Sequence, residues 1–141
     1  MSIKSLNPYL NFDGTAAKAI ALYESALGAK ADGVMRFGEM PGGDFPAEVK
    51  DRIMHARLQV GPGVIMISDT MPGQPCKQGN NVEVIVHYDD AAEMAKAFDA
   101  LAAGGTVGMA IHDAFWGAKY GFLTDAYGVR WSFHCELPKA S

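Results

Sequence analysis

The chain has 141 residues, 49% of them hydrophobic, with 12 basic and 16 acidic side chains and a formal net charge of −4. This length suits one domain with a well-filled core, or two fused half-domains that share one, and it is too short for two independent enzymes. The chain lacks the Lys/Arg cluster that a nucleic-acid surface needs to neutralise phosphates, and it lacks the ~20-residue apolar run of a membrane helix. We therefore expect it to bind neither nucleic acid nor membrane.

The first half of the sequence predicts one helix between short strands. Apolar residues recur at helical spacing from Ala16 to Leu27, and Gly28 ends the run. Residues 13–15 supply a turn and a helix cap, and residues 62–63 form the turn of a hairpin. The predicted strands of this half are residues 5–12, 31–37, 53–60 and 64–68, with a loop at residues 38–51.

The second half predicts the same series of elements. Its helix covers residues 91–102, with Asp89 and Asp90 as the cap and Gly104 and Gly105 closing its end. The predicted strands are residues 82–88, 106–111, 120–124 and 129–135, after a loop at residues 72–81.

The two halves can be aligned with each other. An offset of 75 positions aligns the first strand and the helix of each half, and an offset of 65 aligns the last two strands. The first half therefore carries about ten extra residues, which fall in the loop at 38–51. We predict an α+β fold of two βαβββ modules, about residues 5–70 and 80–137, that form a curved mixed sheet with the helices outside and make one domain of residues 1–141.

Strand pleating predicts which side chains face the concave side of this sheet. In the strand at 82–88, the apolar set Val82, Val84 and Val86 suits packing beneath the helix. The side chains expected to face the concavity are Glu83, Ile85 and His87, the matching Pro8, Leu10 and Phe12 of the first half, and Arg130, Ser132 and His134 of the last strand. An apolar pocket with a few polar groups is the usual form of a ligand site.

Several spaced motifs resemble one known family. They are Asn7-Pro8-Tyr9-Leu10-Asn11-Phe12, the helix segment Ala19-Ile20-Ala21-Leu22-Tyr23, Phe115-Trp116-Gly117, and Asp125-Ala126-Tyr127-Gly128-Val129-Arg130-Trp131. With His55 before a Gly-turned hairpin ending in Ser68 and Asp69, they are similar to the PhnB-like branch of the glyoxalase/bleomycin resistance/extradiol dioxygenase (vicinal oxygen chelate) superfamily. The resemblance spans about residues 6–134 and implies the fold predicted above.

The resemblance also implies a divalent metal, with one ligand near the start of each half's first strand and one on each half's last strand. The matching residues are Pro8, Glu83, Ile67 (or Met66 if the register shifts by one) and Ser132. Only Glu83 is a metal ligand of the usual kind, so we predict no metal at these positions and no other cofactor. A divalent metal held by Glu83, His55 and His87 is the open alternative, although about 13 Å of strand separates Glu83 from His87.

Glu83 is the candidate catalytic residue. An ionised carboxylate among apolar side chains needs water or a cation, so Glu83 either pairs with Arg57 or Arg130 or serves as a ligand anchor or general base. The two readings predict different neighbours for this side chain, and both stay open at this point.

The aromatic residues Phe115, Trp116 and Tyr120 precede the last hairpin. In this superfamily such a segment can border the pocket, where it would stack on a planar ligand, as in the drug-sequestering members; packing in the core or against a second chain is the alternative. The two cysteines, Cys76 and Cys135, lie outside any C-x-x-C spacing and are expected to be free thiols.

We therefore expect a small-molecule-binding protein of this superfamily without the usual metal site. The alternative is a divalent-metal-dependent lyase, isomerase or dioxygenase with a reduced or shifted site, whereas a methyltransferase lacks support because no Gly-rich loop has the required spacing. The expected ligand-binding residues are His55, Arg57, Glu83, His87, Trp116, Tyr120, Arg130 and Ser132. The resemblance also implies a homodimer, for which Met40, Phe45 and Met71 would supply exposed surface, and the absence of a signal-peptide pattern favours a cytoplasmic location.

Overall fold

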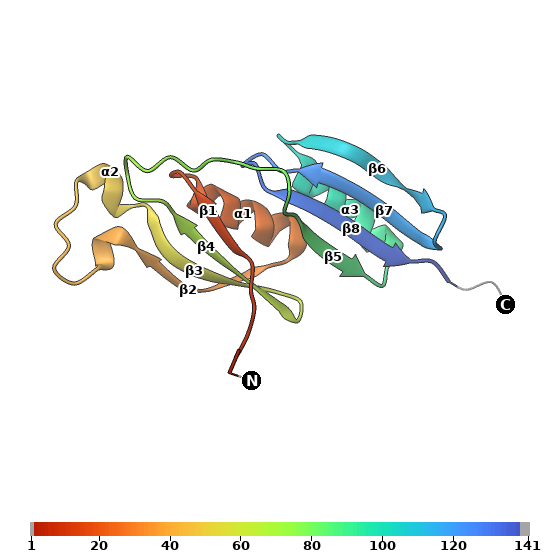
Figure 1. Cartoon of the computed structure of the whole chain (residues 1–141), viewed down its shortest axis with the longest axis horizontal. Coiled ribbons are helices and arrows are strands. Elements are labelled where there is room, and N and C mark those ends of the chain that lie inside the picture. Colours follow the sequence, from red (N-terminus) through yellow and green to blue (C-terminus); the bar gives the residue numbers. More distant parts are fainter. Residues whose placement is uncertain (1, 139–141) are drawn as a thin grey trace. The chain divides into compact units, whose positions relative to one another are not determined.

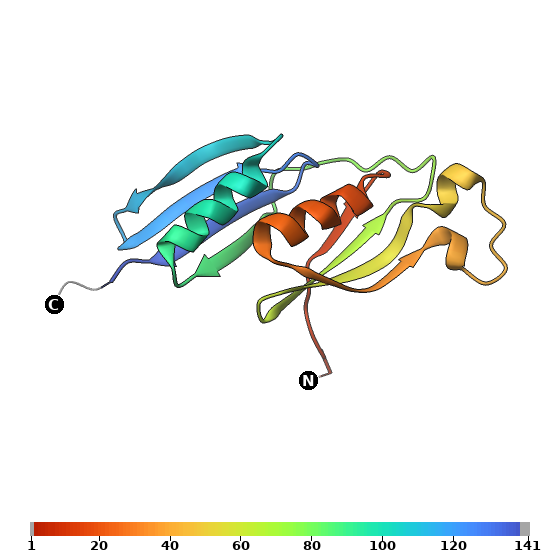
Figure 2. The ribbon, with the colours of Figure 1, turned by 180° about the vertical axis from the view of Figure 1, so that it is seen from behind.

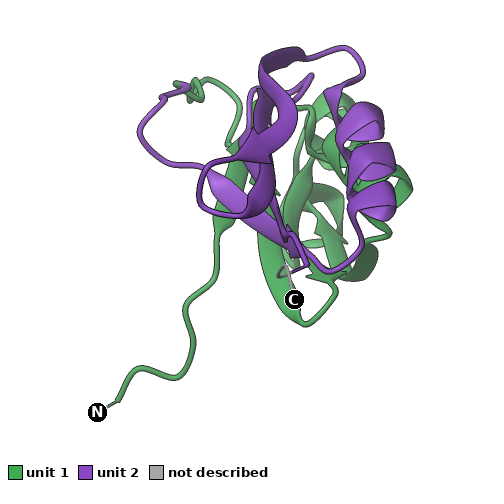
Figure 3. Ribbon diagram, turned by 90° about the vertical axis from the view of Figure 1, so that its right-hand side faces the viewer, with its two compact units in different colours: residues 1–77 green, residues 78–141 purple. Residues whose placement is uncertain are grey.

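The computed structural model describes residues 2–138. The chain divides into two compact units, residues 1–77 and residues 78–141 (Figure 3). In each unit one long helix lies along one face of a four-stranded sheet, as Figure 2 shows.

The first unit contains four strands, one long helix and two short helical segments (Figure 1). In chain order these are β1 (Tyr9–Phe12), α1 (Ala16–Leu27), β2 (Lys30–Arg36), the 3₁₀ helix η1 (Phe37–Glu39), α2 (Ala47–Lys50), β3 (Ile53–Val60) and β4 (Gly63–Asp69). The strands lie in the order β1-β4-β3-β2, with β1 parallel to β4 and the other neighbours antiparallel.

The second unit repeats this topology. Its elements are β5 (Val84–Tyr88), α3 (Ala91–Ala102), β6 (Thr106–Ala114), β7 (Ala118–Thr124) and β8 (Arg130–Glu136). The strand order is β5-β8-β7-β6, again with one parallel pair, β5 and β8. The repeated βαβββ arrangement confirms the predicted α+β fold of two modules.

Both long helices begin and end where the apolar spacing predicts. In α1 the residues Ile20 and Tyr23 are buried, and in α3 the residues Met94 and Leu101 are fully buried. Gly28 ends α1 with a φ of 66°, in the left-handed region that other residues rarely adopt. A narrow apolar stripe at helical spacing is thus sufficient to place each helix on its sheet.

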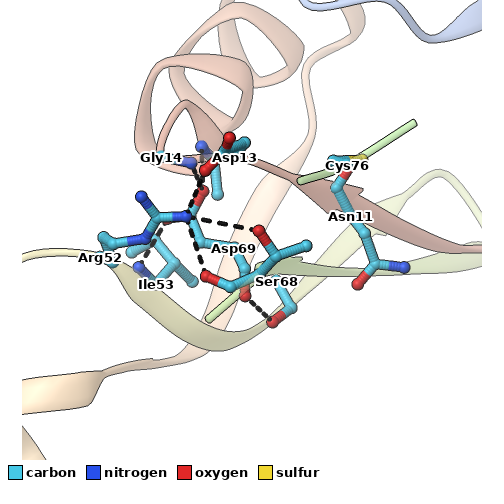
Figure 4. Close-up of polar contacts among 10 residues, drawn as sticks. Asn11, Asp13, Gly14, Arg52, Ile53, Ser68, Asp69 and Cys76 are labelled. Atoms are coloured by element: carbon cyan, nitrogen blue, oxygen red, sulfur yellow. Dashed lines mark hydrogen bonds and ion pairs between the residues drawn. The ribbon is translucent and has the colours of Figure 1, made fainter. Parts of the chain in front are cut away.

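A buried carboxylate, rather than the helix's own cap residue, secures the start of α1 (Figure 4). Thr15 occupies the N-cap position but its side chain makes no capping hydrogen bond. Instead Asp69, at the end of β4, accepts hydrogen bonds from the backbone N–H groups of Gly14 at 2.8 Å, Ala16 at 3.0 Å and Ile53 at 2.8 Å. One side chain therefore ties the starts of α1 and β3 to the end of β4.

Arg52 also joins the segment before α1 to the end of β4. Its guanidinium forms an ion pair with Asp13 at 2.9 Å and donates to the backbone carbonyl of Thr70, also at 2.9 Å. Asp13, predicted as part of the helix cap, thus acts through Arg52 instead (Figure 4).

The register of β1 corrects the predicted orientation of the first strand. Leu10 pairs with Ile67, Phe12 pairs with Asp69, and both Phe12 and Ile67 are buried. Leu10 and Phe12 therefore lie on the α1 side of the sheet, and the prediction that they face away from the helix was wrong. Pro8, predicted to face the same way, precedes β1.

A difference in turn length explains this error. Leu10 lies six residues before Ala16, the first residue of α1, whereas its structural equivalent Val86 lies five residues before Ala91, the first residue of α3. The single extra residue displaces the repeat alignment by one along the strand, and a one-residue shift moves every side chain to the other face.

Smaller differences concern element ends. Strand β5 begins at Val84, and Val82 is 77% exposed rather than packed beneath a helix. Strand β6 extends to Ala114 and β7 begins at Ala118, so residues 115–117 form the tight turn of a hairpin. Within the described part of the chain, no helix has the length and apolar character that crossing a membrane requires.

Candidate functional site

The sheet of the second unit has one face against α3 and one face away from it. Phe133 of β8 packs edge-on against Phe98 of α3, with ring centroids 5.3 Å apart, which places Phe133 on the helix side. Because successive residues of a strand alternate sides, His134 lies on the opposite face. Its register partners, His87 of β5 and Tyr120 of β7, lie there too, and we call the side carrying these three residues the histidine face.

His134 is the centre of a polar and aromatic cluster on this face. Its ring centroid lies 5.1 Å from that of His87, and its Nε2 accepts a hydrogen bond from Nε1 of Trp116 at 3.3 Å. Trp116 in turn packs edge-on against Tyr120, with centroids 5.6 Å apart. The indole can only donate, so Nε2 of His134 is unprotonated and accepts through its lone pair, and a neutral ring holds its proton on Nδ1.

Two open hollows flank the end of β8 beside this cluster. One has a volume of about 480 Å³ and the other about 560 Å³, which lies within the range of small-molecule sites. Both are lined by His134, Glu136, Leu137 and Pro138; the first adds His87, Tyr88 and Asp89, and the second adds Trp116, Gly117 and Ala118. The hollows therefore combine apolar walls, imidazoles and carboxylates.

The pKa of Tyr88 is shifted. Burial of its side chain raises the pKa of the phenol above its usual 10.0, and the negative charge of Glu93 raises it further. Its ring stacks on Phe133, with centroids 5.9 Å apart. The phenol therefore stays neutral beside the smaller hollow under ordinary conditions.

Glu83 forms an ion pair with Arg130, of the two cations considered for it. A guanidinium nitrogen of Arg130 lies 3.8 Å from a carboxylate oxygen of Glu83, and the side chains are 27% and 37% exposed. Arg130 also donates to the backbone carbonyl of Asn80. At this distance the pair is a partly solvated ionic contact rather than a hydrogen bond, and its contribution to stability is small.

Ser132 is enclosed rather than open to solvent. It lies in register between Ile85 of β5 and Phe122 of β7, and only 1% of the residue is exposed. Its Oγ makes no hydrogen bond to any residue in 2–138. A hydroxyl in this position contributes little to a ligand that approaches from solvent.

Two predicted site residues, His55 and Arg57, belong to the first unit. Nδ1 of His55 lies 3.0 Å from the hydroxyl of Tyr9, with ring centroids 5.8 Å apart, so its role there is a strand-to-strand hydrogen bond. Arg57 is exposed and pairs in register with Met66 of β4. Met66, rather than the buried Ile67, therefore faces away from α1.

The residues at the expected metal positions do not suit a divalent ion. A thioether at Met66 and a buried hydroxyl at Ser132 are weak ligands for hard or borderline ions, Pro8 supplies no side-chain donor, and Glu83 is engaged with Arg130. Within residues 2–138, no group of three or more His, Cys, Asp or Glu side chains that could hold a metal ion is found. Of the alternative set, His55 belongs to the first unit, and Glu83 and His87 belong to the second.

The hollows are also lined by His134, Asp89 and Glu136, which the predicted ligand-binding set did not include. His134 was expected to face the concavity but was not included among the ligand-binding residues. Its signal in the sequence was strand alternation, since it lies two residues after Ser132. Asp89 was interpreted only as part of a helix cap, and Glu136 lay beyond the predicted end of the last strand, so neither carried a signal.

Comparison with known proteins supports one assignment. A family model described as the Glyoxalase/Bleomycin resistance protein/Dioxygenase superfamily matches residues 5–133. Among curated proteins, Protein YjdN of Escherichia coli is 34% identical over 138 residues, with 89% of this chain and 91% of that protein covered. An uncharacterized protein of Mycobacterium bovis, Mb0911c, is 32% identical over 135 residues, covering 91% of this chain and 80% of its own length.

Solved structures agree with the family model. The crystal structure of protein PA1353 from Pseudomonas aeruginosa is 38% identical and superposes with a TM-score of 0.85, covering 96% of this chain and 100% of that one. A PhnB protein from Bacillus cereus, titled a putative 3-demethylubiquinone-9 3-methyltransferase, has a TM-score of 0.77 at 22% identity over 96% of this chain and 100% of its own, which shows the shared fold alone. The resemblance predicted from the sequence is thus confirmed, and the chain belongs to the Glyoxalase/Bleomycin resistance protein/Dioxygenase superfamily.

Proposed function

We propose that the protein binds a small, planar molecule on the histidine face of its second unit. The observation that carries this proposal is the position of Trp116, which is 51% exposed and lines the larger hollow together with His134 and Glu136. An indole whose N–H is already bonded still offers its apolar ring to a partner, and leaving that ring in water is unfavourable.

The surroundings of Trp116 suit an aromatic partner. The ring of Tyr120 lies edge-on to that of Trp116, with 5.6 Å between the ring centroids. Rings in edge-to-face contact hold one another in position, so a planar ligand would meet a largely pre-formed surface. This lowers the conformational entropy lost on binding.

The polar groups of the hollows define the chemistry of the ligand further. The carboxylates of Asp89 and Glu136 can only accept hydrogen bonds when ionised, and an imidazole such as that of His87 can accept or donate. A planar ring system that carries N–H or O–H donors matches this set. Drug sequestration, which the bleomycin resistance name of the superfamily describes for other members, is consistent with such a ligand.

The alternative is a metal-dependent lyase, isomerase or dioxygenase centred on Glu83. In this reading the carboxylate would have to exchange its contact with Arg130 for a metal ion. The ion pair, together with the unsuitable donors at Met66 and Ser132, favours binding without the superfamily's metal.

The proposal can be tested by titrating metal-stripped protein with planar bicyclic heteroaromatics, such as quinoline and aminoquinoline, and with metal-free bleomycin. The chain has two tryptophans, and Trp131 is fully buried with its Nε1 bonded to Asp125 at 2.9 Å. Fluorescence excited at the long-wavelength edge of tryptophan absorption therefore reports Trp116, the exposed indole. We expect saturable quenching of this emission, confirmed by isothermal titration calorimetry.

The matched variants are Trp116→Ala and Phe115→Ala. Loss of an aromatic pair worth about 0.5–1.5 kcal/mol, together with its buried area, should weaken binding to Trp116→Ala by roughly tenfold. Phe115 is 97% exposed and lines neither hollow, so its removal should change affinity little. The proposal fails if no probe binds, or if Trp116→Ala binds the probes as tightly as the unaltered protein.

Two further expectations stay predictions. A homodimer was expected to use Met40, Phe45 and Met71; Met71 is 43% exposed, whereas Phe45 packs edge-on against Phe37 at 5.7 Å. Light scattering after size-exclusion chromatography measures the oligomeric state directly. The cytoplasmic location rests on the sequence pattern alone.

A further inference from the structure

His87 and His134 occupy directly opposite positions on neighbouring strands. They are register partners of the parallel strands β5 and β8, and both side chains lie on the histidine face. Their ring centroids are 5.1 Å apart, with an angle of 64° between the ring planes. Neither strand can shift one histidine without breaking the hydrogen-bonded ladder, so the sheet fixes the spacing of the two imidazoles.

This spacing agrees with joint coordination of one ion. An imidazole nitrogen binds Zn(II) at about 2.0–2.1 Å, which places the ring centre about 3.2 Å from the metal. Two such rings at a tetrahedral angle have centres roughly 5.2 Å apart, close to the 5.1 Å observed. Few rearrangements beyond small rotations of the rings are therefore required.

We propose that His87 and His134 form a binding site for a borderline divalent cation, of which Zn(II), Ni(II) and Cu(II) are the class that imidazole prefers. The two imidazoles are the protein donors, and water fills the remaining positions. Asp89 and Glu136 line the adjoining hollow and add negative charge beside the cation. The inference does not depend on the proposed function.

The site is distinct from the positions where the superfamily resemblance places a metal. Glu83 lies four residues before His87 and Ser132 lies two residues before His134. At strand rise Glu83 is about 13 Å from His87, too far for one ion to bind both, and Ser132, about 7 Å from His134, offers only an enclosed hydroxyl. At the expected positions the chain thus has one usual donor, Glu83, which is paired with Arg130, and it carries two good donors farther along the same two strands.

Trp116 provides a built-in reporter of this site. It donates to Nε2 of His134, so a metal on Nε2 must displace the indole; a metal on Nδ1 instead leaves the proton on Nε2, which then cannot accept from the indole. Either mode breaks the Trp116–His134 hydrogen bond. Metal binding should therefore change the emission of Trp116.

The test uses untagged protein, stripped with EDTA and exchanged into a non-coordinating buffer, and titrates it with Zn(II) and Ni(II) by calorimetry. We expect one ion per chain. His87→Asn and His134→Asn should each weaken binding by at least the roughly 10–100-fold that loss of an outer-shell partner costs. His55→Asn and His112→Asn change the other two histidines of the chain and should leave the affinity unchanged.

Three results would overturn the inference: no binding at metal concentrations up to about 1 mM, binding that survives His87→Asn, or binding abolished by Glu83→Gln but not by His87→Asn. Because His87 is exposed, its substitution is not expected to disturb folding, and circular dichroism of each variant checks this. Titration of Trp116 emission with Cu(II) gives a second readout, and an unchanged spectrum with bound metal would also contradict the proposed geometry.

Discussion

Removal of the Asp69 carboxylate should destabilise the first unit strongly. Asp69 is 3% exposed and accepts three backbone hydrogen bonds that join α1, β3 and β4 (Figure 4). The informative pair of variants is Asp69→Ala, which removes both acceptor oxygens, and Asp69→Asn, which keeps the shape of the side chain.

The magnitude follows from the burial of the three donors. The contacts to Ala16 and Ile53 are buried, whereas the contact to Gly14 is only partly buried, so water can replace the last of these. A buried donor left without a partner costs about 1–3 kcal/mol, so Asp69→Ala should lose about 3–5 kcal/mol. Asp69→Asn should lose less, about 1–3 kcal/mol, since one oxygen remains while its NH₂ group meets the N–H of Ile53.

Urea unfolding followed by circular dichroism measures the loss, with Asp90→Ala as the control. Asp90 caps α3 through one exposed hydrogen bond to the backbone N–H of Glu93 at 3.0 Å, and its removal should cost about 1 kcal/mol. Because two units can unfold separately, amide hydrogen exchange assigns each loss to α1 or to α3. The reasoning is refuted if Asp69→Ala is no more destabilising than Asp90→Ala, or if exchange in α1 does not accelerate.

Two further predictions concern single positions. Tyr88 keeps its proton in the folded state beyond pH 10, where the unfolded chain loses it, so its stabilising contribution is present below pH 10 and is lost as pH rises through the raised pKa. Tyr88→Phe should therefore flatten the decline of the unfolding free energy at alkaline pH. Equal slopes of unfolding free energy against pH for both proteins would contradict the assigned burial effect. Gly28→Ala should cost about 1 kcal/mol, because the added Cβ meets no neighbour and only the φ of 66° opposes it, and an unchanged midpoint of thermal unfolding would disprove this.

Local patterns in the sequence determined much of the fold. Apolar spacing and a terminal glycine placed both ends of α1 at Ala16 and Leu27, and the same reasoning placed α3. These signals are local, because a helix satisfies its own backbone and presents one stripe to the sheet. The internal repeat then predicted the βαβββ topology of each unit.

Side-chain direction on the first strand was less predictable. A strand's face depends on register, and one additional turn residue before α1 was sufficient to move Leu10 and Phe12 to the helix side and to bring Tyr9 to the other face. The repeat alignment could not detect that residue, because its matches are compatible with either register.

The candidate site itself was decided by tertiary structure. Whether Glu83 pairs with Arg57 or Arg130 or serves as a ligand anchor or general base was left open, and the structure shows its contact with Arg130. The hydrogen bond from Trp116 to His134 joins a hairpin turn to a residue 18 positions later in the sequence. The pairing of His87 with His134 depends on the parallel strands β5 and β8, which α3, β6 and β7 separate in the sequence. Sequence alone fixed which residue types were available in this unit, whereas strand pairing determined which of them meet.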